Sequence, residues 1–366
     1  MDKHLLHLFF ILLRSGLWER EVEDVSAFPL DEEMWNRLFD LSRQQRVTAI
    51  VFQGINHLPN ELMPGLKGMA RWMAETDAVE RRNRKMNAVL AELYSGINLK
   101  GFTAIVLKGQ GLAQNYAVPM SRDCGDIDFF FNTPTENVAF ADMVKTQGVE
   151  VVTESDGSLC YNWRGVLVEQ HPEMLDLQTP KVKRYFEILQ KQERAIDCCI
   201  DGHLTIKVPA PILNLVLQNS HILKHALGRG VGLRQLCDLA RTYAVFKGKI
   251  DGKQVLEVYR RAGLLKWSDL LHAFLVKDLG LNPTDLPYAY QEEVSSEPLR
   301  KIVLKGGNFG QYVDGNIQYE PDGWKRKWKT FLLFIKNIGF AMKYAPYEAF
   351  WTVVNLAQGA IKARGL

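Results

Sequence analysis

The spacing of apolar positions changes twice along the 366-residue chain. In residues 1–99 apolar side chains recur every three or four positions, which predicts amphipathic helices. In residues 100–208 short apolar runs rich in β-branched and aromatic residues predict strands. Helical spacing returns in residues 209–282, and residues 283–366 combine a loop with basic, aromatic helices. We therefore predict an α+β fold, in which a small mixed sheet is flanked by N-terminal and C-terminal helical regions.

The segment predicted to form the sheet shows its elements in more detail. Residues 102–109 (FTAIVLKG) indicate a buried strand that leads into a glycine turn and a helix. Residues 126–132 (DIDFFFN) indicate a second strand, and an N-capped helix is expected over residues 136–147. A further strand and a hairpin follow, with turns at Asp156-Gly157 and Arg164-Gly165.

The N-terminal segment imitates a signal peptide. Lys3 precedes an apolar run from Leu5 to Leu13. The run is short, His7 interrupts it, and no small-residue cleavage site follows. We therefore interpret this segment as a buried first helix. No apolar run in the chain reaches the length of a membrane span.

Composition and charge narrow the class of protein. The chain is 47% hydrophobic and 24% charged, as is typical of a globular protein, and its formal net charge is +3. This charge is too small to predict nucleic-acid binding by bulk electrostatics, and the basic cluster from Arg81 to Lys85 is interpreted as solvated helix surface. The five cysteines are odd in number and fit no metal-ligand spacing, so we expect reduced thiols in a cytoplasmic protein.

Two aspartates stand at the start of an apolar strand. Asp126 and Asp128 are two positions apart and therefore project from the same face of the strand. Paired carboxylates repel each other unless a cation lies between them, and Mg²⁺ or Mn²⁺ prefers such oxygen ligands. Glu169 on a later strand is the preferred third acidic group, although His171 and Glu173 are also available in the same segment. His171 would share a face with Glu169, and it is also a candidate for lining the cleft.

The turn before these aspartates could bind phosphate. Glycines allow a ligand to approach the backbone closely, and the free amides of a helix start attract phosphate. Lys108, Gly109, Gln110 and Gly111 supply the positive charge, the turn and the amides. On its own this pattern is more typical of a tight turn, but together with the two aspartates it favours phosphate binding. Arg122 is either a phosphate contact or a structural partner of the neighbouring aspartate.

The combined pattern resembles the polymerase-β-like nucleotidyltransferase superfamily. More closely, it is similar to an uncharacterised bacterial nucleotidyltransferase-like family, and the likeness extends to about Leu281. The turn departs from the broader superfamily, which has Gly-Ser or Gly-Gly where this chain has Gly109-Gln110, and its interval to the aspartates is longer. The motif positions of the family are Leu107-Lys108-Gly109, Tyr116, Pro119, Arg122 and Asp126-Ile127-Asp128.

The resemblance implies a two-metal phosphoryl-transfer enzyme. Asp126 and Asp128 would bind Mg²⁺ or Mn²⁺, and Glu169 would complete the site or act as the base. Lys108 and the amides of Gly109 to Gly111 would hold the phosphates of an NTP, with ATP as the expected donor. The NMP would pass to a hydroxyl of a small molecule, a protein or an RNA, releasing pyrophosphate. The alternatives are an inactive relative that binds a nucleotide or a partner protein, and a toxin-type enzyme of a toxin–antitoxin pair.

A second polar group lies in the helical part that follows the sheet. His221, Lys224 and His225 share one helix face. Zinc binding is disfavoured, because the zinc-peptidase pattern needs Glu after the first His and because the lysine would repel a metal. The face would either line the acceptor cleft or make a plain contact between helices.

With the resemblance, the predicted domains are an N-terminal helical region (1–99), the nucleotidyltransferase-like core (100–208), a helical substrate or lid domain (209–282), and a C-terminal loop with helices (283–366).

The C-terminal segment is basic and aromatic. It could lie on anionic lipid as an amphipathic helix, or it could pack Trp324, Phe331 and Phe334 against the body of the protein with its lysines solvated. We favour packing and expect Pro346 to separate two helices. The expected partners are therefore an NTP and an acceptor, without a stable nucleic-acid complex and without membrane association.

Overall fold

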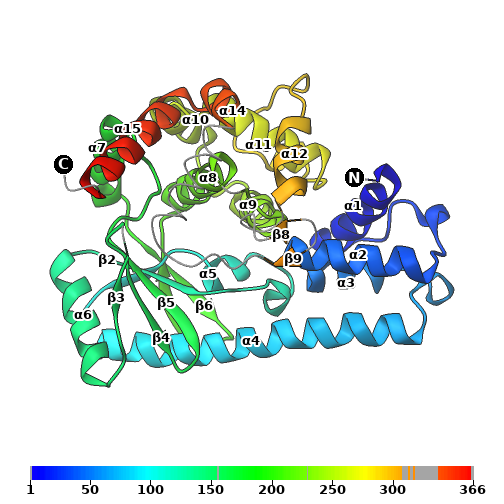
Figure 1. Cartoon of the computed structure of the whole chain (residues 1–366), viewed down its shortest axis with the longest axis horizontal. Helices are drawn as coiled ribbons and strands as arrows, with labels where there is room; N and C mark the ends of the chain where they lie inside the picture. Colours follow the sequence, from blue (N-terminus) through cyan, green and yellow to red (C-terminus); the bar gives the residue numbers. More distant parts are fainter. Residues whose placement is uncertain are drawn as a thin grey trace. The chain divides into compact units, whose positions relative to one another are not determined.

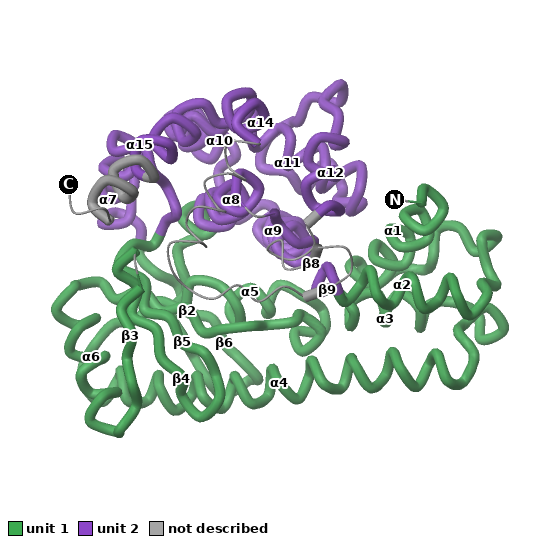
Figure 2. The backbone as a smooth tube through the Cα atoms, viewed as in Figure 1, with its two compact units in different colours: residues 1–43, 47–174, 194–214 green, residues 44–46, 175–193, 215–366 purple. Residues whose placement is uncertain are grey.

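The structure is a computed structural model that describes residues 2–154, 156–228, 230–306, 312–313, 316–317 and 337–363. It contains helices and a seven-stranded mixed sheet, which confirms the predicted α+β class (Figure 1). The chain divides into two compact units, drawn in different colours in Figure 2. Unit 1 comprises residues 1–43, 47–174 and 194–214, and unit 2 comprises residues 44–46, 175–193 and 215–366. The division predicted from the sequence into four parts stays a prediction.

Unit 1 holds the sheet and the N-terminal helices. Its helices are α1 (Lys3–Trp18), α2 (Glu32–Gln44), α3 (Thr48–Ile55), α4 (Leu66–Leu99), the four-residue α5 (Gln110–Ala113) and α6 (Pro134–Thr146). Its strands are β1 (Ala104–Val106), β2 (Ile127–Phe131), β3 (Val152–Thr153), β4 (Leu159–Trp163), β5 (Val166–His171), β6 (Ile196–Ile200) and β7 (Leu204–Val208).

The sheet is mixed because its central strands run in both directions. The order is β3-β4-β5-β2-β1-β7-β6. The central strand β2 is parallel to β5 and antiparallel to β1, and β1 is parallel to β7. The two outer pairs, β4 with β5 and β6 with β7, are antiparallel hairpins. The β4–β5 turn is Arg164-Gly165, and both residues have positive φ (50° and 78°), as a two-residue hairpin of this kind requires.

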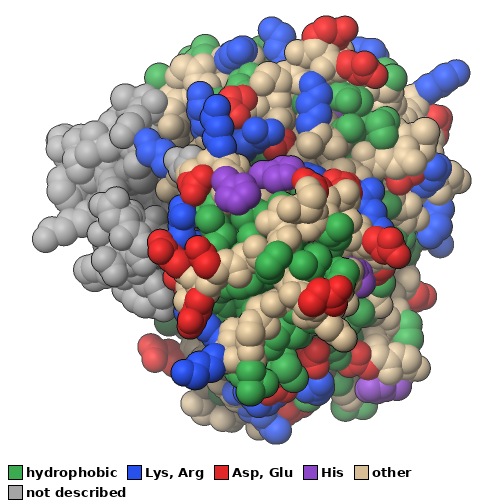
Figure 3. Space-filling model, turned by 90° about the vertical axis from the view of Figure 1, so that its right-hand side faces the viewer, with side chains coloured by type: hydrophobic (Ala, Val, Ile, Leu, Met, Phe, Trp, Pro, Cys, Tyr) green, Lys and Arg blue, Asp and Glu red, His purple; other side chains and the backbone are tan. Residues whose placement is uncertain are grey.

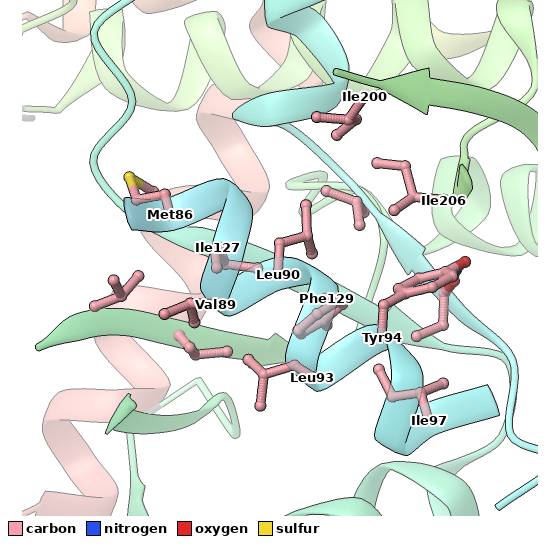
Figure 4. Close-up of a cluster of buried hydrophobic side chains, with 14 of the residues drawn as sticks. Met86, Val89, Leu90, Leu93, Tyr94, Ile97, Ile127, Phe129, Ile200 and Ile206 are labelled. Atoms are coloured by element: carbon pink, nitrogen blue, oxygen red, sulfur yellow. Dashed lines mark hydrogen bonds between the residues drawn. The ribbon is translucent and has the colours of Figure 1, made fainter. Parts of the chain in front are cut away.

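One face of the sheet packs on α4 (Figure 4). The apolar residues of this helix recur at helical spacing and meet alternate residues of the strands, such as Ile127 and Phe129 of β2, both fully buried. Tyr94 of α4 also ties two strands together: its hydroxyl donates to Ala104 O (3.0 Å) and accepts from Lys207 N (2.7 Å). The apolar residues of α4 in this core are Met86, Val89, Leu90, Leu93 and Ile97.

The first helix is buried, as the sequence predicts. Leu8, Leu12 and Leu13 of α1 have no exposed surface. The helix crosses α3 at a very close approach. A Cβ on Gly16 would lie only 1.8 Å from Ile50 O, and a Cβ on Gly54 only 1.9 Å from Leu12 O. Only glycine fits at such a crossing. None of the described helices combines the length and the hydropathy needed to cross a membrane.

Unit 2 is mainly helical. Its helices are α7 (Pro180–Gln192), α8 (Pro211–Leu227, whose first residues belong to unit 1), α9 (Leu233–Phe246), α10 (Gly252–Ala262), α11 (Leu265–Lys277), α12 (Glu297–Gly306), α14 (Ile338–Tyr344) and α15 (Pro346–Ala363). Two short strands, β8 (Tyr312–Val313) and β9 (Asn316–Ile317), pair with each other. Pro346 separates α14 from α15, as predicted, whereas Trp324, Phe331 and Phe334 lie outside the described residues.

Two polar side chains explain why short segments belong to this unit. Glu348 of α15 accepts hydrogen bonds from the backbone amides of Gln178 (2.6 Å) and Thr179 (3.0 Å), just before α7 begins. A carboxylate at a helix N-terminus is favourable because it satisfies free amides and opposes the helix dipole. Gln45 donates to Val303 O (3.1 Å) and accepts from Leu233 N (3.0 Å), which attaches residues 44–46 to this unit.

A buried histidine of α11 lies between a tyrosine of α9 and a tyrosine of the loop that follows α11. His272 has no exposed surface, and its Nε2 lies 3.0 Å from the hydroxyl of Tyr243. Its ring also packs against Tyr288 (ring centroids 4.8 Å apart). The Nδ1 atom has no hydrogen-bond partner among the described residues. Burial lowers the pKa of His272 to about 3, so this side chain is neutral in the folded protein at pH 7.

Candidate metal and nucleotide site

Parallel strands β2 and β5 place two acidic residues side by side. In their register Asp128 lies directly opposite Glu169, and both side chains project from the face of the sheet opposite the α4 core. Asp128 is 2% exposed, and Glu169 is partly exposed. Asp126 immediately precedes β2 and is partly exposed. Glu173 lies beyond the end of β5 and is exposed.

Asp128 contacts two side chains that can carry a positive charge. Its Oδ1 atom lies 2.6 Å from Nε2 of His171 and 3.2 Å from Nζ of Lys108. The same nitrogen of His171 lies 3.6 Å from Oε2 of Glu169. His171 comes from the last position of β5, two residues after Glu169, which puts the two side chains on one face. The structure therefore brings Lys108, Asp128, Glu169 and His171 together.

Three of these residues form a possible metal-ligand group. Asp128, Glu169 and His171 each offer one ligand atom, and these three atoms lie within 4.8 Å of one another. No other group of this kind occurs among the described residues. Asp126 is outside the group, but its charge acts on Glu169. The ligand set predicted from the sequence is Asp126, Asp128 and Glu169, with His171 assigned to the cleft. The geometry places His171 beside the carboxylates, on the face that it is predicted to share with Glu169.

The titration of the site follows from its crowding. Burial and then the charges of Asp128 and Asp126 raise the pKa of Glu169, and the nearby His171 and Lys108 offset this in part. Burial alone would lower the pKa of His171, but the hydrogen bond and the charge of Asp128 outweigh it and raise that pKa. A cluster of this kind has an excess of acidic groups, and a bound cation would relieve their repulsion.

The donor set fits a divalent cation. Carboxylate oxygens suit Mg²⁺ and Mn²⁺, whereas an imidazole nitrogen suits Mn²⁺ and the later transition metals better than Mg²⁺. Asp128 and Glu169 provide the oxygens, and His171 provides a nitrogen on the same face. The residues present therefore fit a metal ion of the Mg²⁺ or Mn²⁺ class.

The glycine turn lies against the start of β2. Gly109 has φ of +60°, and a Cβ there would lie 3.3 Å from Asp126 O, so the turn requires glycine for both its conformation and its close approach. Gly111 is packed on Val208, because a Cβ there would lie 2.8 Å from Val208 Cγ1. Gln110 is 2% exposed, yet neither atom of its side-chain amide has a hydrogen-bond partner among the described residues. Buried amides are normally paired, so a polar ligand would satisfy Gln110.

Arg122 belongs to a loop that is fixed to α4. Its side chain is buried, and its Nη1 donates to Cys124 Sγ (3.2 Å). The neighbouring Asp123 forms an ion pair with Arg82 of α4. Asn83, the next residue of α4, donates to the backbone carbonyl of Arg122 (2.8 Å). The sequence does not predict that Arg82 and Asn83 support this loop, because helical spacing does not reveal which distant loop a residue contacts.

The polar face of α8 has a partner that the sequence does not reveal. In unit 2, Asp176 accepts from Lys224 Nζ (2.6 Å) and lies 2.9 Å from Nδ1 of His221. The rings of His221 and His225 meet edge to face, with centroids 4.5 Å apart. The partner Asp176 lies in the loop before α7 and not in a helix, so both the expected contact between helices and the role of this face in an acceptor cleft stay predictions.

Comparisons with known proteins identify the family. A model described as "Uncharacterised nucleotidyltransferase" matches residues 31–276, more than half of the chain and including both strands of the site. No curated protein matches the sequence significantly. One similar solved structure is an antigenic nucleotidyltransferase-like protein from Paracoccidioides brasiliensis, with 13% identity, a TM-score of 0.32, and coverage of 53% of this chain and 92% of that one. By its match to the family model, this chain belongs to the uncharacterised nucleotidyltransferase family.

Proposed function

We propose that this protein is a metal-dependent nucleotidyltransferase that moves an NMP from an NTP, with ATP as the expected donor, to a hydroxyl acceptor. One observation carries the proposal: the register of β2 and β5 sets Asp128 beside Glu169, with His171 within reach of both. Family membership supports the nucleotidyltransferase class, and the converging ligand atoms support metal dependence.

Each residue of the site has a role in this proposal. Asp128, Glu169 and His171 would hold the metal, with Asp126 adding negative charge beside them. When bound, a divalent ion would neutralise phosphate charge and favour ionisation of the acceptor hydroxyl. Lys108 and the amides of the glycine turn would hold the phosphates, and Gln110 would donate to a phosphate oxygen.

The transfer itself is a displacement at the α-phosphorus. The acceptor oxygen forms a bond to that phosphorus, while the bond to the bridging oxygen breaks and pyrophosphate leaves. The hydroxyl proton would pass to Glu169, whose carboxylate lies beside Asp128 in the adjacent strand. Lys108 would move from Asp128 toward the phosphates as they enter.

A second function is favoured by one specific observation. Lys108 and His171 both contact the same oxygen of Asp128, so this carboxylate has cationic or hydrogen-bonding partners without a metal. A relative that binds a nucleotide but has lost catalysis would show this arrangement. It would bind ATP without transferring the NMP.

Thermal stabilisation by Mn²⁺ and a non-hydrolysable ATP analogue tests the proposal, followed by a pyrophosphate-release assay against a library of hydroxyl acceptors. We expect the pair of ligands to raise the melting temperature of the wild type and to lose this effect in Asp128→Asn. Asp142→Asn on the exposed surface of α6 is the matched control and should behave as the wild type. An Asp128→Asn protein that keeps full stabilisation and transfer would refute the assignment, and binding without pyrophosphate release would favour the inactive relative.

A further inference from the structure

A basic pocket lies in unit 1 where strands β2 and β5 begin. It has a volume of about 380 Å³ and is bounded by α4, by the loop before β2 and by the β4–β5 turn. Three of its side chains are cationic: Arg81, Arg82 and Lys85, which come from adjacent turns of α4. The remaining lining residues are Met86, Gly125, Gly165, Val166 and Leu167.

Two of the three cations of this pocket pair with carboxylates and keep donor capacity. Arg81 pairs with Asp77 and Arg82 pairs with Asp123, which uses only part of the five N–H donors of each guanidinium. Lys85 forms no ion pair with any described residue, and its Nζ lies 3.5 Å from Gly165 O. Among the described residues, the pocket therefore contains one ammonium group without a counter-charge and two guanidinium groups that each pair with one carboxylate.

The β4–β5 turn leaves the space that Lys85 occupies. Gly165 has φ of +78°, and a Cβ there would lie 2.6 Å from Lys85 Nζ. The positive φ of the glycine suits the hairpin turn, and the flexible end of Lys85 occupies the space beside it. Below the cations, Met86 belongs to the apolar core with Ile127, so the pocket has a fixed floor (Figure 4).

The pocket adjoins the proposed catalytic residues along two strands. Gly125 of its wall immediately precedes Asp126. Leu167 precedes Glu169 by two residues, a distance of roughly 7 Å along a strand, while α4 covers the face of the sheet opposite Glu169. A ligand held by α4 could therefore extend past Gly125, which has no side chain, to the rim where Asp126 lies.

We propose that this pocket binds the phosphate group of a phosphorylated acceptor. The proposal rests on the proposed function, because it assigns the substrate class of the same site. Guanidinium and ammonium groups are the protein donors best suited to phosphate. The Lys108 turn is already assigned to the phosphates of the NTP. The α4 pocket is a separate set of cations at the neighbouring strand ends, suited to an acceptor that carries its own phosphate.

Binding of inorganic phosphate in the presence of EDTA tests the pocket without requiring catalysis. We expect Lys85→Gln to weaken phosphate binding by about tenfold, because one charge-assisted hydrogen bond is lost. Arg84→Gln is the matched control: it removes one positive charge from the same helix, but Arg84 pairs with Glu80 and does not line the pocket. It should bind phosphate as the wild type does. Equal loss in both variants, or no loss in Lys85→Gln, would overturn the proposal.

Two further measurements distinguish phosphate bound in the α4 pocket from phosphate bound at the Lys108 turn. Lys108→Gln should weaken phosphate binding under EDTA less than Lys85→Gln does, and Lys85→Gln should keep stabilisation by Mn²⁺ and the ATP analogue. If Lys108→Gln loses phosphate while Lys85→Gln keeps it, the phosphate belongs to the nucleotide turn and the proposal is wrong. If Lys85→Gln loses ATP binding, the pocket serves the donor and the proposal is equally wrong. Failure of the proposed function is seen separately, in the Asp128→Asn comparison with Mn²⁺ and the ATP analogue.

Discussion

His171 is the residue whose position most changes the chemistry expected of the site. The sequence assigns it to the cleft, whereas its Nε2 lies 2.6 Å from Asp128 and 3.6 Å from Glu169. An imidazole nitrogen among two carboxylates makes the site a mixed nitrogen and oxygen donor set. The residue can therefore influence which divalent ion binds, and not only how an acceptor is held.

This position leads to a prediction about metal preference. We expect His171→Asn to raise the Mn²⁺ concentration needed for half-maximal thermal stabilisation with the ATP analogue by about tenfold, and to change the Mg²⁺ requirement less, because Mg²⁺ prefers oxygen ligands. The exposed His203→Asn is the control. If both metals bind the variant as well as the wild type, His171 is not a ligand.

At the scale of single elements, α1 and α3 show how closely two helices can approach. A Cβ on Gly54 would lie 1.9 Å from the backbone of Leu12, which neither helix can accommodate without moving. We expect Gly54→Ala to lower the free energy of unfolding by about 3 kcal/mol. Gly96→Ala on α4 is the control, since its Cβ would meet only Met143 Cε at 3.5 Å and alanine favours a helix. Urea unfolding of both variants measures the difference, and equal stability would contradict the close crossing.

Helix α11 buries a histidine that only the unfolded chain can protonate near neutral pH. The pKa of His272 is about 3 in the folded protein and about 6.5 in an unfolded chain. As the pH falls, the unfolded state therefore binds a proton on this histidine before the folded state does. The stability that comes from the neutral buried histidine is complete above about pH 6.5 and is lost as the pH falls toward 3.

This pH dependence can be measured by urea unfolding. Between pH 7 and pH 5 we expect His272 to reduce the free energy of unfolding by about 2 kcal/mol. His272→Phe should show a smaller loss over the same range, because the phenyl ring does not titrate, while His203→Asn should keep the wild-type dependence. The same pH dependence in wild type and His272→Phe would show that this histidine does not control it.

Across the whole molecule, the chain passes between its two units several times. Residues 1–214 contain all of unit 1, but they also contain α7, which belongs to unit 2. The apolar residues Val182, Phe186 and Leu189 of α7 are buried. In a fragment ending at residue 214 they would lack their unit 2 neighbours and promote association.

A comparison of two fragments tests this. We expect fragment 1–214 to elute as aggregates in size-exclusion chromatography, and a version with residues 175–193 replaced by a glycine-serine linker to be mainly monomeric. The full chain is the reference for elution. Identical profiles of the two fragments would contradict the assignment of α7 to unit 2.

The distribution of charged side chains over the surface agrees with the small net charge of the chain. On the face drawn in Figure 3, acidic and basic side chains are interspersed, as expected for a formal net charge of +3. The pocket of Arg81, Arg82 and Lys85 is a local exception on α4. The sequence interpretation of this cluster as solvated surface does not identify the pocket, because the turn and the loop that complete it are distant in the sequence.

The sequence predicts the parts of the fold that depend on local patterns. The strand after Asp126, the Arg164-Gly165 turn and the buried first helix all follow from neighbouring residues. The pairing of Asp128 with Glu169 depends on which strands become neighbours, so the sequence can suggest this pairing but cannot establish it. Strands β6 and β7 are not predicted individually; β6 is an edge strand, and three of its five residues are exposed.

The short connection after β5 has a mechanical consequence. His171 ends that strand, and the chain leaves unit 1 after Met174, only three residues later. A segment of three residues spans at most roughly 11 Å when fully extended, so it can absorb little movement. A displacement of His171 by a bound ligand would therefore be passed along the backbone within these few residues.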